Sequence, residues 1–173
     1  MKVIVSDPIS VEGLKILKDN NIEVVDIDWQ NIDKDLNDIK TADGWIVRSG
    51  TTLDSSTIEK ALNLSVIGRA GVGVDNIDIS AATRRGIVVL NTPDANTTSA
   101  AEHTMALILA LSRNVSYGHV GLSKGEWNRH LLIGSELHGK TIGIIGLGKI
   151  GREVMQRCKA FNMQILGYDP FIP

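Results

Sequence analysis

The sequence has only one cysteine, Cys158, among its 173 residues. A single thiol excludes an internal disulfide, so packing and hydrogen bonds must hold the fold together. Cys158 falls inside an expected helix, residues 152–161, where a small apolar side chain suits packing better than redox chemistry. We therefore expect a reducing, cytoplasmic setting.

The sequence also lacks an excess of positive charge and any long apolar run. With a formal net charge of −2, the chain lacks the basic field that proteins use to bind nucleic acid or an anionic membrane. The longest apolar run, residues 105–111, is too short to span a bilayer. The N-terminus begins as a strand and lacks the longer apolar stretch of a signal peptide. Neither nucleic acid nor membrane is expected as a partner.

The sequence likewise contains no pattern typical of a metal site or of a catalytic nucleophile. No metal-ligand spacing occurs, and Ser99 and Ser123 lack the surroundings of a nucleophile elbow. None of the four histidines, His103, His119, His130 and His138, is assigned as a catalytic base. His103 lies beside apolar residues of an expected helix, where a structural role is expected, and His130 and His138 lie in a polar arm with no carboxylate at a fixed spacing.

What the sequence does contain is a regular alternation of short apolar runs and helical segments. Strands are expected at residues 3–5, 22–25, 44–47, 65–68 and 87–90. Helices are expected between them, at residues 11–17, 33–39, 55–62 and 78–84. This alternation predicts an α/β fold with a parallel sheet covered on both faces. Turn residues at 91–94 then indicate a boundary, which gives domains 1–93 and 94–173.

Beyond this boundary the sequence predicts helices and an arm. Ser99 and Glu102 have the spacing of a capping box and predict a helix from residue 99 to about residue 113. A second helix is expected at residues 114–124, and residues 125–130 read as an irregular arm.

Residues 139–151 carry the most informative motif. An apolar strand runs into Gly146, Gly148 and Gly151, which have the spacing G-x-G-x-x-G, and a helical segment follows. The first glycine allows a tight turn, the second lets backbone approach a pyrophosphate, and the third lets the helix pack closely on the strand. The helix N-terminus would then face the phosphates.

Asp169 completes this motif, because it ends a second apolar strand at residues 164–168. A carboxylate there can accept hydrogen bonds from the adenosine ribose, and it would repel a 2′-phosphate. The sequence therefore predicts NAD as the cofactor, in preference to NADP.

Three loops at the carboxyl ends of expected strands are candidates for binding substrate. Arg48 and Ser49 offer a guanidinium and a hydroxyl for a carboxylate or phosphate, although Arg48 could instead pair with an acid at the surface. The glycine-rich residues 68–76 could form a backbone nest for an anion, or could simply make room for a close domain contact. Residues 91–96 add asparagine side chains.

With these residues identified, the chain resembles the D-isomer-specific 2-hydroxyacid dehydrogenases over essentially its whole length. The block from residue 68 to 76 is more specific than the glycine motif alone. The other matching segments are residues 46–49, 91–93, 99–102, 139–154 and 168–170.

The resemblance implies a flavodoxin-like parallel-sheet substrate domain followed by the start of a Rossmann NAD-binding domain. The positions that match substrate-binding residues of the family are Arg48, Ser49, Arg69, Gly71, Gly73 and Asn96. Those that match cofactor-binding residues are Val72, Gly146, Gly148, Lys149, Ile150, Gly151 and Asp169. At Val72 the family often has threonine, so only the backbone could serve there.

The resemblance also implies a reaction and an assembly. We expect NAD-dependent oxidation of 3-phosphoglycerate to 3-phosphohydroxypyruvate, the first step of serine biosynthesis, in a homodimer or homotetramer. The helix from residue 99 and the arm around Trp127 match the dimerisation region, and Arg129 could reach a partner's active site. The family's catalytic Arg, Glu and His would fall after Pro173, so we expect the Rossmann domain to be cut short and the chain alone to be inactive.

Two other interpretations remain open. The chain could be a non-catalytic module that binds NAD or dimerises, such as a corepressor-like protein. It could also belong to a dehydrogenase of another D-2-hydroxy acid, because Arg48 and Arg69 favour a doubly anionic ligand without proving a phosphate.

Overall fold

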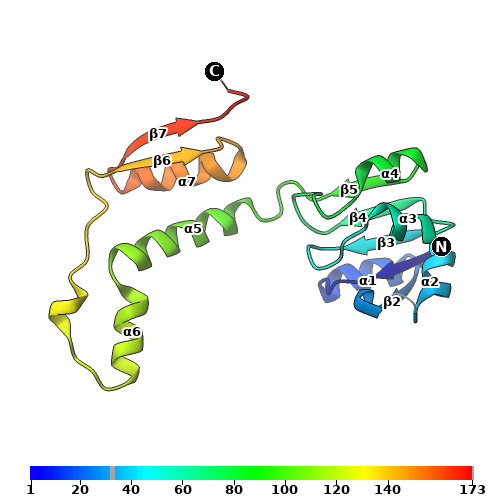
Figure 1. Cartoon of the computed structure of the whole chain (residues 1–173), viewed down its shortest axis with the longest axis horizontal. Helices are drawn as coiled ribbons and strands as arrows, with labels where there is room; N and C mark the ends of the chain where they lie inside the picture. The colour runs from blue at the N-terminus through cyan, green and yellow to red at the C-terminus, as the bar shows by residue number, and fades with distance from the viewer. Residues whose placement is uncertain (32–33, 173) are drawn as a thin grey trace. The chain divides into compact units, whose positions relative to one another are not determined.

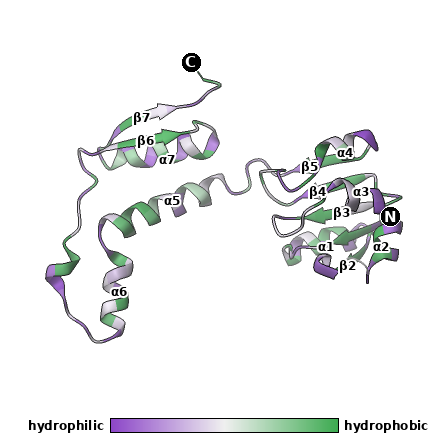
Figure 2. Cartoon of the chain, viewed as in Figure 1, coloured by the Kyte–Doolittle hydropathy of each residue, from purple (hydrophilic) through white to green (hydrophobic). Residues whose placement is uncertain are grey.

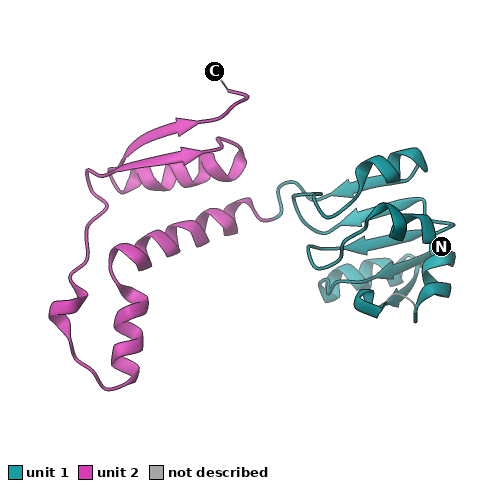
Figure 3. Ribbon diagram, in the orientation of Figure 1, with its two compact units in different colours: residues 1–95 teal, residues 96–173 magenta. Residues whose placement is uncertain are grey.

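The chain divides into two compact units, Met1–Ala95 and Asn96–Pro173 (Figure 3). The computed structural model describes residues 1–31 and 34–172. The division lies close to the boundary expected between residues 93 and 94, while the roles assigned to the two parts stay predictions. Within the described residues, no helix is both long and apolar enough to cross a membrane.

Unit 1 is built on a five-stranded sheet in the order β2-β1-β3-β4-β5, and every neighbouring pair is parallel (Figure 1). The predicted α/β fold class is thus confirmed. Because the strands are parallel, their carboxyl ends meet at one edge, and the strand order reverses between β1 and β3. The strands are β1 Lys2–Val5, β2 Glu23–Asp26, β3 Gly44–Val47, β4 Val66–Arg69 and β5 Val88–Asn91.

Helices cover the faces of this sheet, and polar side chains fix where three of them begin. Ser10 accepts a hydrogen bond from the Gly13 N–H and so caps the first helix. Asp54 and Asp78 cap their helices in the same way. The helices are α1 Val11–Asp19, α2 Leu36–Thr41, α3 Ser55–Lys60 and α4 Ile79–Arg84, with a 3-10 turn, η1, at Trp29–Asn31. Asp33, the expected start of the second helix, lies outside the described residues.

The core of unit 1 lies between the sheet and its helices. Apolar β-branched residues dominate the central strands because both faces of a parallel sheet are buried, and Figure 2 draws β1 and β3 in hydrophobic colours. Trp45 is the largest fully buried side chain. Its neighbours in the core include Ile4, Ile39, Leu53, Ile58 and Ile67.

Unit 2 contains a second, two-stranded parallel sheet, in which β6 pairs with β7 along all five residues. A small core joins this sheet to two helices, with Met105 of α5 packed against Val154 and Cys158 of α7. Cys158 is fully buried, and its Sγ lies 3.6 Å from the Met105 Sδ, so its expected packing role is confirmed. The elements are α5 Thr97–Ser112, α6 Val115–Ser123, the 3-10 turn η2 Arg129–Leu132, β6 Thr141–Ile145, α7 Lys149–Ala160 and β7 Gln164–Tyr168.

The expected capping box at the start of α5 is wrong. The helix begins at Thr97, so Ser99 lies in its first turn, where its hydroxyl donates to the Asn96 carbonyl at 3.1 Å. Glu102 instead pairs with Arg157 of α7, 3.8 Å away. A tertiary contact, which local spacing cannot reveal, therefore explains this acid.

Candidate functional site

The loop after β3, residues 48–51, lies at the carboxyl edge of the sheet in unit 1; we call it the β3 loop. Its Arg48 and Ser49 side chains are exposed. Asp7, just beyond β1, holds this loop from one side. The buried Asp7 carboxylate accepts the N–H of Arg48 at 2.6 Å and that of Thr51 at 3.1 Å through the same oxygen. The loop is therefore anchored at the point where the strand order reverses.

Asn76 holds the same loop from the other side. Its amide nitrogen donates to the carbonyl of Arg48 at 2.6 Å and to that of Thr51 at 2.5 Å. Its amide oxygen accepts from the Arg69 Nε at 3.1 Å. One side chain thus connects the β3 loop to the glycine-rich loop after β4, residues 70–76.

Gly71 faces the guanidinium of Arg69 in this second loop. A Cβ at Gly71 would collide with Arg69 Nη1 and would come within 3.0 Å of Arg69 Cζ, so glycine leaves room for the arginine to fold back. A Cβ at Gly73 would lie 2.7 Å from the Asp75 carboxylate. The glycines of the block therefore accommodate polar side chains of their own loop.

The end of β5 and the residue after it hold the glycine-rich loop, residues 70–76, which we call the β4 loop. Asn91 donates through its side chain to the Val72 carbonyl at 2.7 Å, and the Thr92 N–H donates to the Gly71 carbonyl at 2.9 Å. These bonds turn the carbonyls away, and among the described residues no group accepts from the N–H of Val72 or Gly73. Two neighbouring N–H groups near a guanidinium can bind an anion.

The glycine motif of unit 2 has the geometry that its spacing predicted. Gly146 has a φ of +95°, which side chains rarely adopt, so the tight turn requires glycine. A Cβ at Gly151 would collide with the carbonyl oxygen of Gly146. Nothing lies within 4 Å of the Cβ position at Gly148, so its backbone remains open to approach. The tight turn at Gly146 and the close approach at Gly151 are thereby confirmed, while the role of Gly148 toward a pyrophosphate stays a prediction.

Asp169 closes the turn. One carboxylate oxygen accepts the N–H of Leu147 at 2.7 Å, and the other accepts the N–H of Phe171 at 2.9 Å. These bonds, that from Phe171 first, lower the pKa of Asp169 below its usual range, and the charge of Arg152 adds to the effect. A carboxylate oxygen can accept two hydrogen bonds, so the ionised Asp169 keeps capacity for a ligand's hydroxyl groups.

The amino end of α7 fits a pyrophosphate. The helix begins at Lys149 after the cap residue Gly148, which has no side chain to occupy the first-turn N–H groups. These N–H groups and the helix dipole favour an anion. The side chain of Ile150 packs against the core of unit 2, so only its backbone could contact a phosphate.

The structure brings most of the predicted residues together in two clusters, one in each unit. Arg48, Ser49, Arg69 and the glycines 71 and 73 lie on connected loops of unit 1. The cofactor residues Gly146 to Gly151 lie in the turn after β6 and at the start of α7, and Asp169, just beyond β7, accepts a hydrogen bond from that turn. Val72 belongs to unit 1. Asn96 precedes α5 in unit 2. Their roles in binding remain predictions.

Sequence reasoning missed Asp7 and gave no role to Asn76. Asp7 lies two residues after the end of an apolar strand, at the same sheet edge as the expected site, and this position could have identified it. The role of Asn76 depends on contacts 25 and 28 residues away along the chain, for which local patterns offer no signal.

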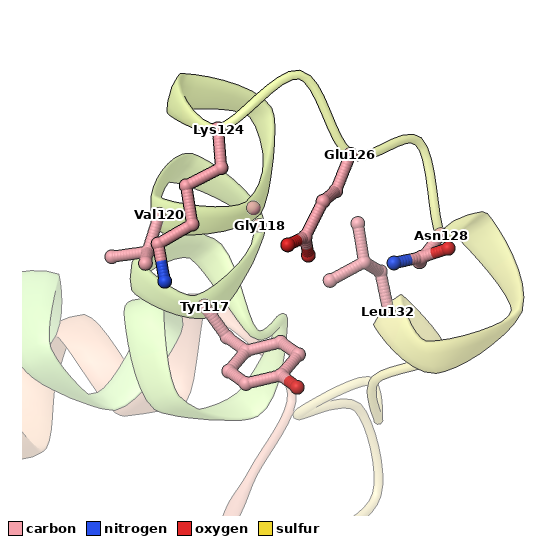
Figure 4. A pocket seen from close by; sticks show the side chains of 8 residues that line it. Tyr117, Gly118, Val120, Lys124, Glu126, Asn128 and Leu132 are labelled. Atoms are coloured by element: carbon pink, nitrogen blue, oxygen red, sulfur yellow. The ribbon is translucent and has the colours of Figure 1, made fainter.

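No cluster of three or more metal-ligating side chains exists within residues 1–31 and 34–172. A small hollow of about 100 Å³ lies between α6 and the segment that follows it, away from the expected site residues. Figure 4 shows Tyr117, Lys124, Glu126 and Leu132 around it. This hollow lies in the region expected to mediate dimerisation.

Comparison with known proteins identifies relatives over the whole chain. Residues 3–166 match the profile of the D-isomer specific 2-hydroxyacid dehydrogenase catalytic domain. A D-3-phosphoglycerate dehydrogenase from Methanocaldococcus jannaschii is 51% identical over 176 aligned residues, which cover 100% of this chain and 33% of the relative. The chain thus spans about a third of that protein's length.

Two solved structures are also similar. One is an NAD-dependent formate dehydrogenase from Staphylococcus aureus in complex with NAD, 33% identical with a TM-score of 0.88 over 99% of this chain and 57% of that one. The other is a 3-phosphoglycerate dehydrogenase from Entamoeba histolytica with bound NAD⁺, 34% identical with a TM-score of 0.80 over 100% of this chain and 55% of that one.

Proposed function

This chain belongs to the D-isomer specific 2-hydroxyacid dehydrogenases, and we propose that it serves as the part of a D-3-phosphoglycerate dehydrogenase that binds substrate anions and NAD. The reaction would be the oxidation of 3-phosphoglycerate to 3-phosphohydroxypyruvate, at the start of serine biosynthesis in the cytoplasm. The observation that carries the proposal is the 51% identity to such an enzyme over the whole chain.

Unit 1 would bind the substrate. Arg48 and Arg69 supply two positive charges beside the exposed N–H groups of the β4 loop, a combination that suits a ligand with a carboxylate and a phosphate. Ser49 adds a hydroxyl that can donate to an anion. These groups would orient the hydroxyacid without themselves moving protons.

Unit 2 would bind NAD. The open backbone at Gly148 and the amino end of α7 would hold the pyrophosphate, and Asp169 would accept hydrogen bonds from the adenosine ribose. NAD would accept the hydride from the substrate, while the residues of this chain would bind and orient the cofactor.

Calorimetry with the 173-residue chain tests both binding sites. We expect heat on titration with NADH and with 3-phosphoglycerate. Asp169→Ala should weaken NADH at least about tenfold, because a hydrogen bond to a charged group contributes about 1.5–3 kcal/mol and about 1.4 kcal/mol is a factor of ten. Arg48→Ala should weaken only 3-phosphoglycerate. Absence of heat with both ligands would contradict the proposal.

A chimaera tests the reaction. This chain would replace the matching third of the Methanocaldococcus jannaschii enzyme, and NAD reduction would be followed with 3-phosphoglycerate, glycerate and lactate. We expect reduction that depends on the phosphate. A second candidate, a dehydrogenase of another D-2-hydroxy acid, rests on the match of residues 3–166 to the general 2-hydroxyacid dehydrogenase profile. A chimaera that prefers an unphosphorylated acid would favour that candidate.

Unit 2 would also form a homodimer, alone or within a tetramer. Large apolar side chains stay exposed along the end of α5, on α6 and after it, including Leu111 at 82%, Ile133 at 81% and Trp127 at 70%. Exposed apolar residues gathered in this way are typical of subunit interfaces. Sedimentation of the chain and of a Leu111→Asp variant tests this: we expect a dimer and a monomer, respectively. A monomeric unsubstituted chain would contradict it.

A further inference from the structure

The β3 loop is held at both edges by two side chains that come from distant parts of unit 1. Asp7 accepts both N–H groups, from Arg48 and Thr51, and Asn76 donates to both carbonyls of the same two residues. Four backbone groups are thus satisfied by one carboxylate oxygen and one amide nitrogen. We call this arrangement the Asp7–Asn76 clamp.

The clamp leaves the tip of the loop available. Among the described residues, no group accepts from the N–H of Ser49 or Gly50. Asp7 also dictates glycine at the tip, because a Cβ at Gly50 would collide with its second carboxylate oxygen. The outer residues of the loop are therefore fixed, while its tip presents N–H groups beside the exposed Arg48.

The same clamp also positions the side chain of Arg69. The Asn76 oxygen accepts from the Arg69 Nε at 3.1 Å, so only the outer guanidinium nitrogens of Arg69 remain for a ligand. The Asn76 side chain therefore binds both the backbone of Arg48 and the guanidinium of Arg69, and so fixes the position of each relative to the other. Only an amide combines a two-hydrogen donor with an acceptor at this position; a carboxylate would keep the acceptor and lose the donor.

We propose that Asp7 and Asn76 are positioning residues for the anionic substrate, acting through the β3 loop and Arg69. This inference rests on the proposed function, because it assigns to these residues the preorganisation of the proposed substrate site. Preorganised charges and N–H groups bind an anion without first losing conformational freedom. The two residues need not touch the ligand themselves.

The hydrogen bonds of the clamp predict how substitutions of Asp7 and Asn76 should change the affinity for the substrate anion. Asp7→Ala removes the acceptor of both N–H groups, so the affinity should fall by about tenfold or more, whereas Asp7→Asn retains an accepting oxygen and should restore most of it. Asn76→Asp places a carboxylate against two carbonyls, and leaving those groups unsatisfied should weaken binding by about tenfold or more. Asn63→Asp, at an exposed position of unit 1, controls for the added charge.

The experiment is calorimetric titration of the chain and its variants with 3-phosphoglycerate and with inorganic phosphate, well below their melting temperatures. A purely structural role would lower the melting temperature of Asn76→Asp and leave its dissociation constant equal to that of Asn63→Asp. Equal constants in these two variants would overturn the inference. No binding by the unsubstituted chain would instead overturn the proposed function on which it rests.

Nuclear magnetic resonance of the unsubstituted chain covers the case in which Asn76→Asp does not fold. The Arg69 Nε–H signal and the Asn76 side-chain amide signals should shift together on titration with 3-phosphoglycerate, with the midpoint found by calorimetry. Binding that leaves the Asn76 amide signals unmoved would overturn the inference.

Discussion

The Asp169 carboxylate accepts a hydrogen bond from the backbone N–H of Leu147, at 2.7 Å, inside the glycine turn of unit 2. The residue expected to bind the ribose therefore also shapes the turn expected to bind the pyrophosphate. Both parts of the proposed cofactor site depend on one ionised group, so pH and substitution at Asp169 should affect them together.

The first prediction concerns acid. The pKa of Asp169 is lowered by its hydrogen bonds from Phe171 and Leu147. Because the pKa of Asp169 is lower in the folded state, its ionised carboxylate stabilises the fold at any pH above the unfolded-state pKa of about 3.9. This stabilisation is lost as the pH falls through the lower, folded-state pKa. We expect the Leu147 amide signal to move only below about pH 3.9, following the Asp169 carboxyl carbon. A Leu147 shift that titrates near neutral pH would contradict this.

The second prediction concerns the choice between cofactors. Replacing Asp169 with serine removes the negative charge that would repel a 2′-phosphate. We expect the ratio of NADPH to NADH affinity, measured by calorimetry, to rise by about tenfold or more, since close like charges at a binding site cost on the order of kilocalories. Asp169→Glu keeps the charge and should keep the preference for NADH. An unchanged ratio in the serine variant would exclude the charge as its cause.

The third prediction tests the close packing at Gly151. Gly151→Ala places a Cβ against the Gly146 carbonyl oxygen, so either the turn or α7 must shift. We expect a lower melting temperature and loss of measurable NADH binding. The matched control is Gly143→Ala in β6, where nothing lies within 4 Å of the added carbon. Equal NADH affinity in both variants would show that the contact at Gly151 is dispensable.

The fourth prediction concerns the core of unit 1. Ile67 in β4 is fully buried, whereas Val88 in the edge strand β5 is 55% exposed. Ile67→Ala should lower the free energy of unfolding by about 2–5 kcal/mol, and Val88→Ala by roughly 0.5 kcal/mol or less. Chemical denaturation of the two variants measures both values. Similar losses would mean that the two sites are equally buried in solution.

The fifth prediction concerns the cap of α3. Asp54 accepts the Thr57 N–H at 2.8 Å, and this hydrogen bond is the main cause of its lowered pKa. Asp54→Ala should destabilise unit 1 by about 1 kcal/mol. Asp54→Asn retains an acceptor and should cost clearly less; a loss as large as that of alanine would mean that charge, and not the cap, stabilises the helix.

Much of the fold followed from the sequence because its signals are local. Runs such as residues 44–47 contain enough apolar residues to define a buried strand, and the turn residues between the runs limit where each strand can end. The start of α5 did not follow, because Glu102 pairs with Arg157 of another helix. An ion pair between two helices forms only when the chain folds, so it cannot be predicted from the residues adjacent to Glu102 in the sequence.

The candidate site likewise contains residues that could be predicted from the sequence and residues that could not. Gly146 and Gly151 were predictable since backbone conformation and close packing restrict those positions to glycine in any sequence context. Asp7 and Asn76 were not, because their importance comes from contacts 25 to 44 residues distant along the chain. The sheet order, which no local pattern specifies, brings these residues together.

Every hydrogen bond of the Asp7–Asn76 clamp is made within residues 1–95. Natural or engineered recombination that exchanges this segment as a whole would transfer the proposed substrate site intact. A crossover between residues 7 and 76 would separate Asp7 from Asn76. Gene shuffling among related dehydrogenases should therefore yield functional hybrids mainly when the junction spares this interval.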